Sequence, residues 1–120
     1  MGKESIQLVV DFDIHELDTF LSVAQACSDY VASNEAGTLN YDWYIAPDKK
    51  SGKLLETYEN QQALETHLLG PVFTEIGPQF KKSIRWQAFQ SFGELPPLFH
   101  ELLGAIPNEN WPTAAIKLRG

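Results

Sequence analysis

A chain of 120 residues is long enough for one domain, and a hydrophobic content of 43% is enough for a packed core. The net charge of -7 argues against nucleic acid and anionic membrane surfaces as partners, because both attract basic patches. The single cysteine, Cys27, excludes an intramolecular disulfide and a multi-cysteine metal site, and we interpret it as a core-facing helical residue.

The first predicted elements are a strand and a long helix. Apolar residues alternate from Ile6 to Phe12, which is the period of a strand buried mainly on one face. This run is too short to span a membrane and no small-residue cleavage site follows it, so we expect a cytoplasmic protein. Asp13 and Glu16 have the spacing of a capping box, which predicts that a helix begins there, and Gly37 lies just past its end.

A β-hairpin is predicted next, with strands at 38–45 and 53–59 on either side of a polar loop. If Ala46 and Lys53 form the last pair before the loop, one face carries the pairs Ile45–Leu54, Trp43–Glu56 and Tyr41–Tyr58, together with Leu39. We interpret this face as the one under the helices because it has more apolar surface. A slip of one residue would exchange the two faces.

Two helical segments follow the hairpin. Asn60 is a good N-cap for a helix at 61–69. Apolar spacing predicts a second helical piece at 72–80, and Gly77 with Pro78 interrupts it because proline removes a donor and clashes with the preceding turn.

The last predicted strand covers 83–92. Strict alternation places Ile84, Trp86 and Ala88 on one face of it and Arg85, Gln87 and Phe89 on the other. A short helix at 96–103 and an irregular tail at 105–120 complete the chain. The tail is apolar around Trp111, and we expect it to pack across a dimer seam.

The predicted order is β-α-β-β-α-β with an appended helix and tail, an α+β ferredoxin-like protomer. We expect one domain at 1–120, with its core at 5–93 and the C-terminal helix and tail at 94–120. Two helices cover only one face of such a sheet. The other face would show Val9, Tyr44, Leu55 and Phe89 among polar residues, which predicts a homodimer through this open face.

Four segments then resemble the antibiotic biosynthesis monooxygenase family. They read GTLNYDWY, LLETYE, QALETHL and FGELPPLFHELL, and the resemblance extends from Ile6 to about Leu103. It implies a dimeric α/β barrel, and an enzyme that oxidises phenols, quinols or anthrones with molecular oxygen and without metal or flavin.

The chain departs from two branches of that family. Where the anthrone-oxidising branch has an Asn and, four residues on, a Trp, this chain has Leu54 and Tyr58, and the Arg of that branch has no clear match at 78–82. The haem-degrading branch has a haem-ligating His, and this chain has His67 and Gly77 in that part of the sequence. We therefore expect no haem and no other cofactor.

A candidate site lies where the helix at 61–69 folds back over its own strand. His67 would act as the base, and Glu56 and Tyr58 would share its face, with Glu56 holding the other imidazole nitrogen. A flat aromatic pocket for a small aromatic substrate would be formed by Tyr41, Trp43, Leu54, Phe73, Phe80 and Trp86. The three histidines are not at ligand spacing, so we expect no metal site.

Other interpretations of these residues remain open. His67 and Glu56 could be a hydrogen-bonded pair that closes the helix onto the sheet, with the aromatic residues as ordinary core. The protein would then be a non-catalytic dimeric module that binds a small hydrophobic ligand. Haem binding would instead give a Soret band on titration.

Overall fold

The computed structural model describes residues 4–118, so residues 1–3 and 119–120 of the predicted domain and tail lie outside the described part. Ten elements follow one another along the chain: β1 Ile6–Ile14, α1 Leu17–Asn34, β2 Thr38–Ile45, β3 Ser51–Tyr58, α2 Gln61–Leu69, a π-helical turn Val72–Ile76, a 3₁₀ turn Gly77–Lys82, β4 Ile84–Phe92, α3 Pro97–Leu103 and β5 Asn108–Trp111.

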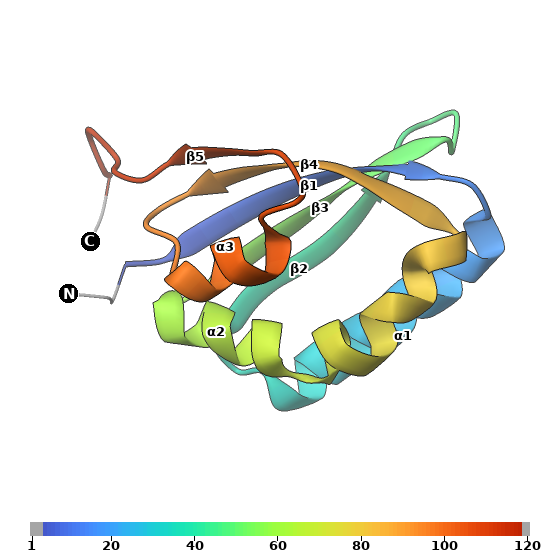
Figure 1. Ribbon diagram of the computed structural model, residues 1–120, viewed down its shortest axis with the longest axis horizontal. Coiled ribbons are helices and arrows are strands. Elements are labelled where there is room, and N and C mark those ends of the chain that lie inside the picture. The colour runs from blue at the N-terminus through green and yellow to red at the C-terminus, as the bar shows by residue number, and fades with distance from the viewer. Residues whose placement is uncertain (1–3, 119–120) are drawn as a thin grey trace.

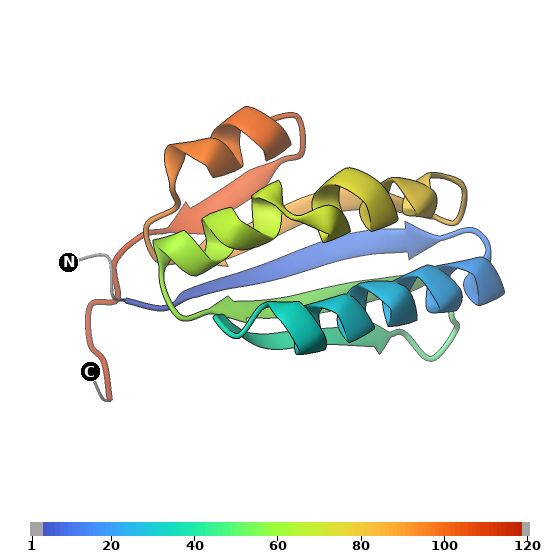
Figure 2. The same cartoon turned by 90° about the horizontal axis from the view of Figure 1, so that it is seen from below.

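The strands form one sheet in the order β2-β3-β1-β4-β5. β1 pairs antiparallel with both β3 and β4, β2 pairs antiparallel with β3, and β5 pairs parallel with β4. All helices lie on one face of the sheet, and the other face is bare (Figures 1 and 2). The β1–β4 part has the predicted ferredoxin-like order, and the appended helix is present.

The hairpin register differs from the predicted one by two residues. Trp43 lies opposite Leu54, Tyr41 opposite Glu56 and Ile45 opposite Gly52. Because side chains alternate with a period of two, this shift keeps Tyr41, Trp43 and Ile45 on their predicted face. Leu39 is an exception: the ladder is irregular between Thr38 and Asn40, and Leu39 is 55% exposed.

The predicted start of the first helix was wrong. β1 continues to Ile14, so Asp13 lies in the sheet between Ser51 and Arg85 and caps nothing. The N-cap of α1 is Glu16, whose side chain makes no capping bond. Pairing on both sides of β1 outweighs the local capping signal.

The predicted faces of β4 were also partly wrong. The β1–β4 ladder shifts register between Phe12, opposite Trp86, and Asp11, opposite Ala88. An extra residue at this point reverses the alternation beyond it. Phe89 therefore lies opposite Val10 and is buried on the helix-covered face, not on the open face.

The C-terminal tail is not wholly irregular. β5 pairs with β4 over Asn108 to Trp111, and the backbone N–H of Gly93 donates to the carbonyl of Trp111 at 2.9 Å. Trp111 is 53% exposed in the isolated chain. Its predicted packing across a dimer seam stays a prediction.

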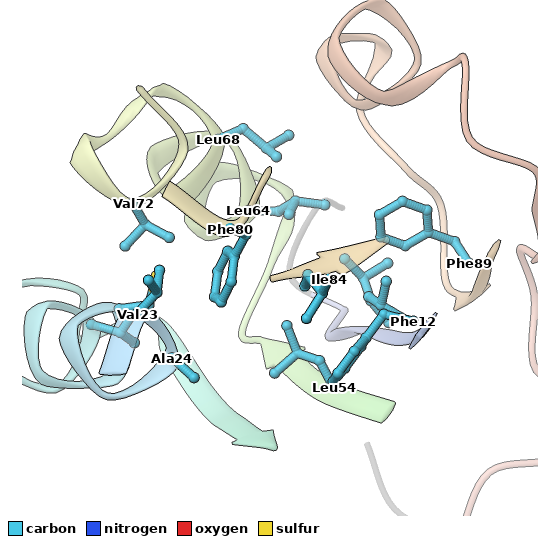
Figure 3. Close-up of a cluster of buried hydrophobic side chains, with 14 of the residues drawn as sticks. Phe12, Val23, Ala24, Leu54, Leu64, Leu68, Val72, Phe80, Ile84 and Phe89 are labelled. Atoms are coloured by element: carbon cyan, nitrogen blue, oxygen red, sulfur yellow. The ribbon is translucent and has the colours of Figure 1, made fainter. Parts of the chain in front are cut away.

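The core lies between the sheet and the helices. Figure 3 shows apolar side chains from several elements meeting there, including Val23 and Ala24 of α1, Leu64 of α2 and Leu54 of β3. Among residues 4–118, no helix is both long enough and apolar enough to cross a membrane.

Candidate active site

The site is assembled by β3 and by the helix that follows it directly. Alternation along β3 buries Glu56 and Tyr58 on the helix-covered face. Asn60 then caps α2, because its side-chain oxygen accepts from the backbone N–H of Ala63 at 2.8 Å. Along α2 the buried residues are Leu64, His67 and Leu68, the spacing of one helical face. The imidazole is therefore turned toward the sheet.

His67 is held by an acid at the end of another helix. Its Nδ1 lies 2.8 Å from Oε1 of Glu35, and the side chains of both residues are only 4% exposed. Glu35 is the C-cap of α1, and its backbone N–H donates to the carbonyl of Val31. The Thr38 hydroxyl donates to the same oxygen at 3.0 Å. A carboxylate can only accept, so the Nδ1–H donates to Glu35, and Nε2 is the ring nitrogen left for another partner.

The other imidazole nitrogen faces Glu56 without a hydrogen bond. Nε2 of His67 lies 3.9 Å from Oε1 of Glu56, which is beyond hydrogen-bonding distance. The Tyr58 hydroxyl donates to that same Glu56 oxygen. The structure thus brings His67, Glu56 and Tyr58 together, and the nitrogen nearer Glu56 is left free to take a proton.

Burial shifts the pKa values of the groups around His67. Desolvation raises the pKa of Glu56 above its ordinary value of 4.5, although the neighbouring His67 charge and the Tyr58 hydrogen bond act in the opposite direction. Burial, followed by the charge of Glu56, raises the pKa of Tyr58 and of Tyr41 well above 10. Both phenols are therefore neutral hydrogen-bond donors at pH 7.

A cavity of about 220 Å³ lies between the sheet and the helices. The polar side chains on its wall are Glu56, His67 and Tyr41, and Trp86 adds an indole ring with one N–H group. The remaining lining is apolar, glycine or proline: Leu8, Val10, Leu54, Leu64, Leu68, Val72, Phe73, Gly77, Pro78, Phe80, Phe89, Leu103 and Ile106. This volume is below the roughly 300–1,000 Å³ of sites for drug-sized ligands, so the cavity suits a small ligand.

Five of the six residues predicted to form the pocket line this cavity, and Trp43 does not. Its indole N–H donates to the Ser28 hydroxyl of α1 at 3.1 Å, which holds the ring against the core. There it packs edge-on against Phe12 and Phe20, with ring centroids 5.8 Å and 5.5 Å away.

Aromatic rings surround the imidazole. The rings of Tyr41 and Tyr58 lie 5.4 Å from that of His67, and the ring of Phe73 lies 6.5 Å from it. Such walls exclude water and offer faces on which a planar ring can pack. The imidazole is therefore enclosed by flat, largely apolar walls.

Metal chemistry has little support in the described part of the chain. No group of three His, Cys, Asp or Glu side chains there is placed to hold a metal ion. Cys27 is fully buried, and burial raises its pKa to about 12, so its thiol is not a ready ligand or nucleophile.

Comparison with known proteins now adds to this geometry. The family model for antibiotic biosynthesis monooxygenases matches residues 9–79, more than half of the chain. The chain belongs to this family. A search of curated proteins found no match.

Several solved structures have a similar fold. MupZ from Pseudomonas fluorescens has a TM-score of 0.77 at 20% identity, covering 99% of this chain and 91% of its own. SnoaB, a cofactor-independent oxygenase from Streptomyces nogalater, has a TM-score of 0.66 at 16% identity and covers 79% of this chain and 97% of its own. Rv0793 from Mycobacterium tuberculosis has a TM-score of 0.63 at 19% identity, covering 78% and 97%. At these identities the likeness shows the fold.

Sequence reasoning missed Glu35 as a site residue. It is 32 positions from His67, and it follows a helix end where the chain direction is set by the turn at Gly37. The one local signal is an acidic residue at a helix C-terminus, where the helix dipole disfavours negative charge. Such an unfavourable position indicates that the carboxylate has another partner.

Proposed function

We propose that this protein is a cofactor-independent monooxygenase that oxidises a small phenolic, quinol or polyketide-like aromatic with molecular oxygen. His67 is the base, and Glu56 orients the substrate. Tyr58 does not line the cavity and acts through Glu56, because its hydroxyl donates to the carboxyl of Glu56. Tyr41, Leu54, Phe73, Phe80 and Trp86 bind the substrate ring. The substrate is itself the electron donor, so no cofactor takes part.

The observation that carries this proposal is the free Nε2 of His67 at the wall of an apolar cavity. Nδ1 is bonded to Glu35, so Nε2 is the proposed proton acceptor, and the carboxyl of Glu56 lies 3.9 Å from it. Family membership and the likeness to SnoaB, a cofactor-independent oxygenase, support oxygen as the second substrate.

The reaction balances without another reactant. His67 removes a proton from the substrate, and the resulting anion transfers electrons to oxygen. In an anthrone, or in the keto tautomer of a phenol or quinol, one oxygen atom replaces two hydrogens on a ring CH₂ to give a carbonyl, and the second oxygen leaves as water with those hydrogens. The water-poor cavity protects the anion until oxygen reacts.

The test is oxygen uptake with a panel of quinols and anthrones. We expect His67→Ala to lose the catalysed rate, because general-base catalysis contributes about 10²–10⁴-fold. His100→Ala is the matched control, since His100 is exposed on α3 and is not among the residues that line the cavity. Unchanged turnover in His67→Ala would remove His67 from the mechanism.

A second candidate is a non-catalytic module that binds a small hydrophobic ligand. It is favoured by the internal pairing of the polar groups, since Glu35 binds His67 and Tyr58 binds Glu56. Saturable binding of an aromatic ligand with no oxygen uptake would favour this candidate over the enzyme.

We also propose that two copies associate through the open face of the sheet. Exposed apolar side chains on this face include Tyr44, Leu55 and Phe92, which are 56%, 38% and 38% exposed. A second copy of the same face would remove them from water.

A further inference from the structure

The segment after β4 is attached to the sheet edge by backbone pairing. β4 ends at Phe92, where the β-α-β-β-α-β unit is complete, and residues 93–111 return to pair β5 with β4. The N–H of Phe89 donates to the carbonyl of Pro107 at 2.7 Å. Buried Ser91 exchanges hydrogen bonds with Asn108 and Asn110 of β5 at 3.1 Å and 2.9 Å.

The helix within this segment is anchored by one aromatic residue. Phe99 of α3 is 1% exposed, and its ring meets that of Phe89 edge-on at a centroid distance of 5.2 Å. α3 also contacts α2, the helix that carries His67, and Figure 2 shows the two helices side by side over the same face of the sheet. The segment is therefore part of the layer that roofs the cavity.

Two apolar residues of this segment reach the cavity. Leu103, the last residue of α3, and Ile106, in the loop that follows, both line it. They are held in one turn, because the N–H of Ile106 donates to the carbonyl of Leu103 at 3.1 Å. Leu102, the preceding residue, points outward and is 46% exposed.

We propose that Leu103 and Ile106 form a specificity wall that limits the size of the aromatic ligand. These two residues lie beyond the ferredoxin-like unit and beyond the residues that the family model matches. The wall has no side-chain hydrogen-bonding group, so the part of the ligand against it is apolar. The polar part of the ligand lies toward Glu56 and His67. This proposal rests on the proposed function in taking the cavity as the ligand site.

The test compares ligands of two lengths by equilibrium binding, without turnover. The probes are 1-naphthol, with two rings, and 1-hydroxyanthraquinone, with three. Each probe is added to the protein, and the change in tryptophan fluorescence gives the dissociation constant. We expect Leu103→Ala and Ile106→Ala each to shift the ratio of the two dissociation constants by about tenfold toward the three-ring probe, the usual effect of small volume changes in an apolar pocket.

Leu102→Ala is the matched control, because it removes the same atoms from the same helix outside the cavity. Leu103→Met keeps the volume, and we expect it to keep the wild-type ratio. The thermal unfolding temperature of each variant shows whether a change in binding comes from a destabilised fold or from the altered cavity wall.

Equal ratios in Leu102→Ala and Leu103→Ala would overturn the proposal, and so would the absence of saturable binding of both probes to the wild-type protein. If the ratio of the two dissociation constants shifts as expected but no substrate supports oxygen uptake, the specificity wall is supported and the proposed monooxygenase activity is not.

Discussion

His67 is fixed on one side and open on the other. Glu35 holds Nδ1 at 2.8 Å, and Nε2 has no hydrogen bond with a described residue. Glu35 Oε2 is itself a buried oxygen with no hydrogen-bond partner among the described residues. This oxygen is therefore available to a further donor.

The pKa of Glu56 predicts how stability depends on pH. Burial raises this pKa above 4.5, so the folded protein keeps the proton of Glu56 at pH values where the unfolded chain has lost it. The free energy of unfolding therefore falls as the pH rises from about 4.5 through the raised pKa. Glu56→Gln cannot titrate, so we expect its free energy of unfolding to fall less steeply in this window, by at most about 1.4 kcal/mol per pH unit.

Denaturant unfolding of both proteins between pH 4 and pH 8 measures this difference. Glu59→Gln is the control, since Glu59 is exposed beside the same strand end. Parallel curves for Glu56→Gln and the wild type would show that the buried carboxyl does not titrate as expected.

How far the site could be predicted depends on the distance between partners in the sequence. Glu56, Tyr58 and His67 lie within 12 positions of the sequence. Alternation along one strand and the short helix that follows it were therefore enough to predict that they meet. Glu35 could not be paired with His67 in this way. No local pattern fixes which helix end meets α2.

At the scale of elements, α2 sits unusually close to the turn after α1. A Cβ on Gly37 would lie 2.7 Å from the Cβ of Ala63, a separation that real Cβ atoms do not tolerate. The N–H of Glu59 also donates to the carbonyl of Gly37 at 2.9 Å. Glycine at this position therefore lets α2 approach closely enough for His67 to meet Glu35.

We expect Gly37→Ala to destabilise the protein by about 1–3 kcal/mol, as overpacking does. Ala63→Gly alone costs about 1 kcal/mol because glycine is a poor helix former. The double variant recovers part of the first loss, since it restores the space. Chemical denaturation of the four proteins in a double-mutant cycle measures this coupling. Strictly additive losses would contradict the close contact.

Element prediction succeeded where the pattern is local and failed where the pairing is remote. The hairpin faces survived a register error of two residues because the side-chain period is also two. Phe89 was placed on the wrong face because a bulge in β4 cannot be read from alternation. β5 was missed because Asn108–Trp111 is short and polar and becomes a strand only by lying along β4.

At the scale of the whole molecule, the bare sheet face is the feature that predicts self-association. We expect Leu55→Asp to convert a dimer into a monomer in sedimentation velocity, because it places a charge in the middle of the proposed interface. Leu21→Asp is the control: Leu21 is 45% exposed on α1, on the opposite side of the sheet. An unchanged dimer in Leu55→Asp would exclude this face as the interface.

Because Glu35 is the C-cap of α1 and also binds His67, unwinding of the last turn of α1 would disturb the orientation of the proposed base. The last turn of α1 and the imidazole share one residue, so fraying of that turn also frees the ring to rotate and to exchange tautomers. Amide protons near Val31 and the ring nitrogens of His67 are then expected to report one common opening event, and a mutation that loosens this helix end is expected to weaken the proposed catalysis without touching the cavity.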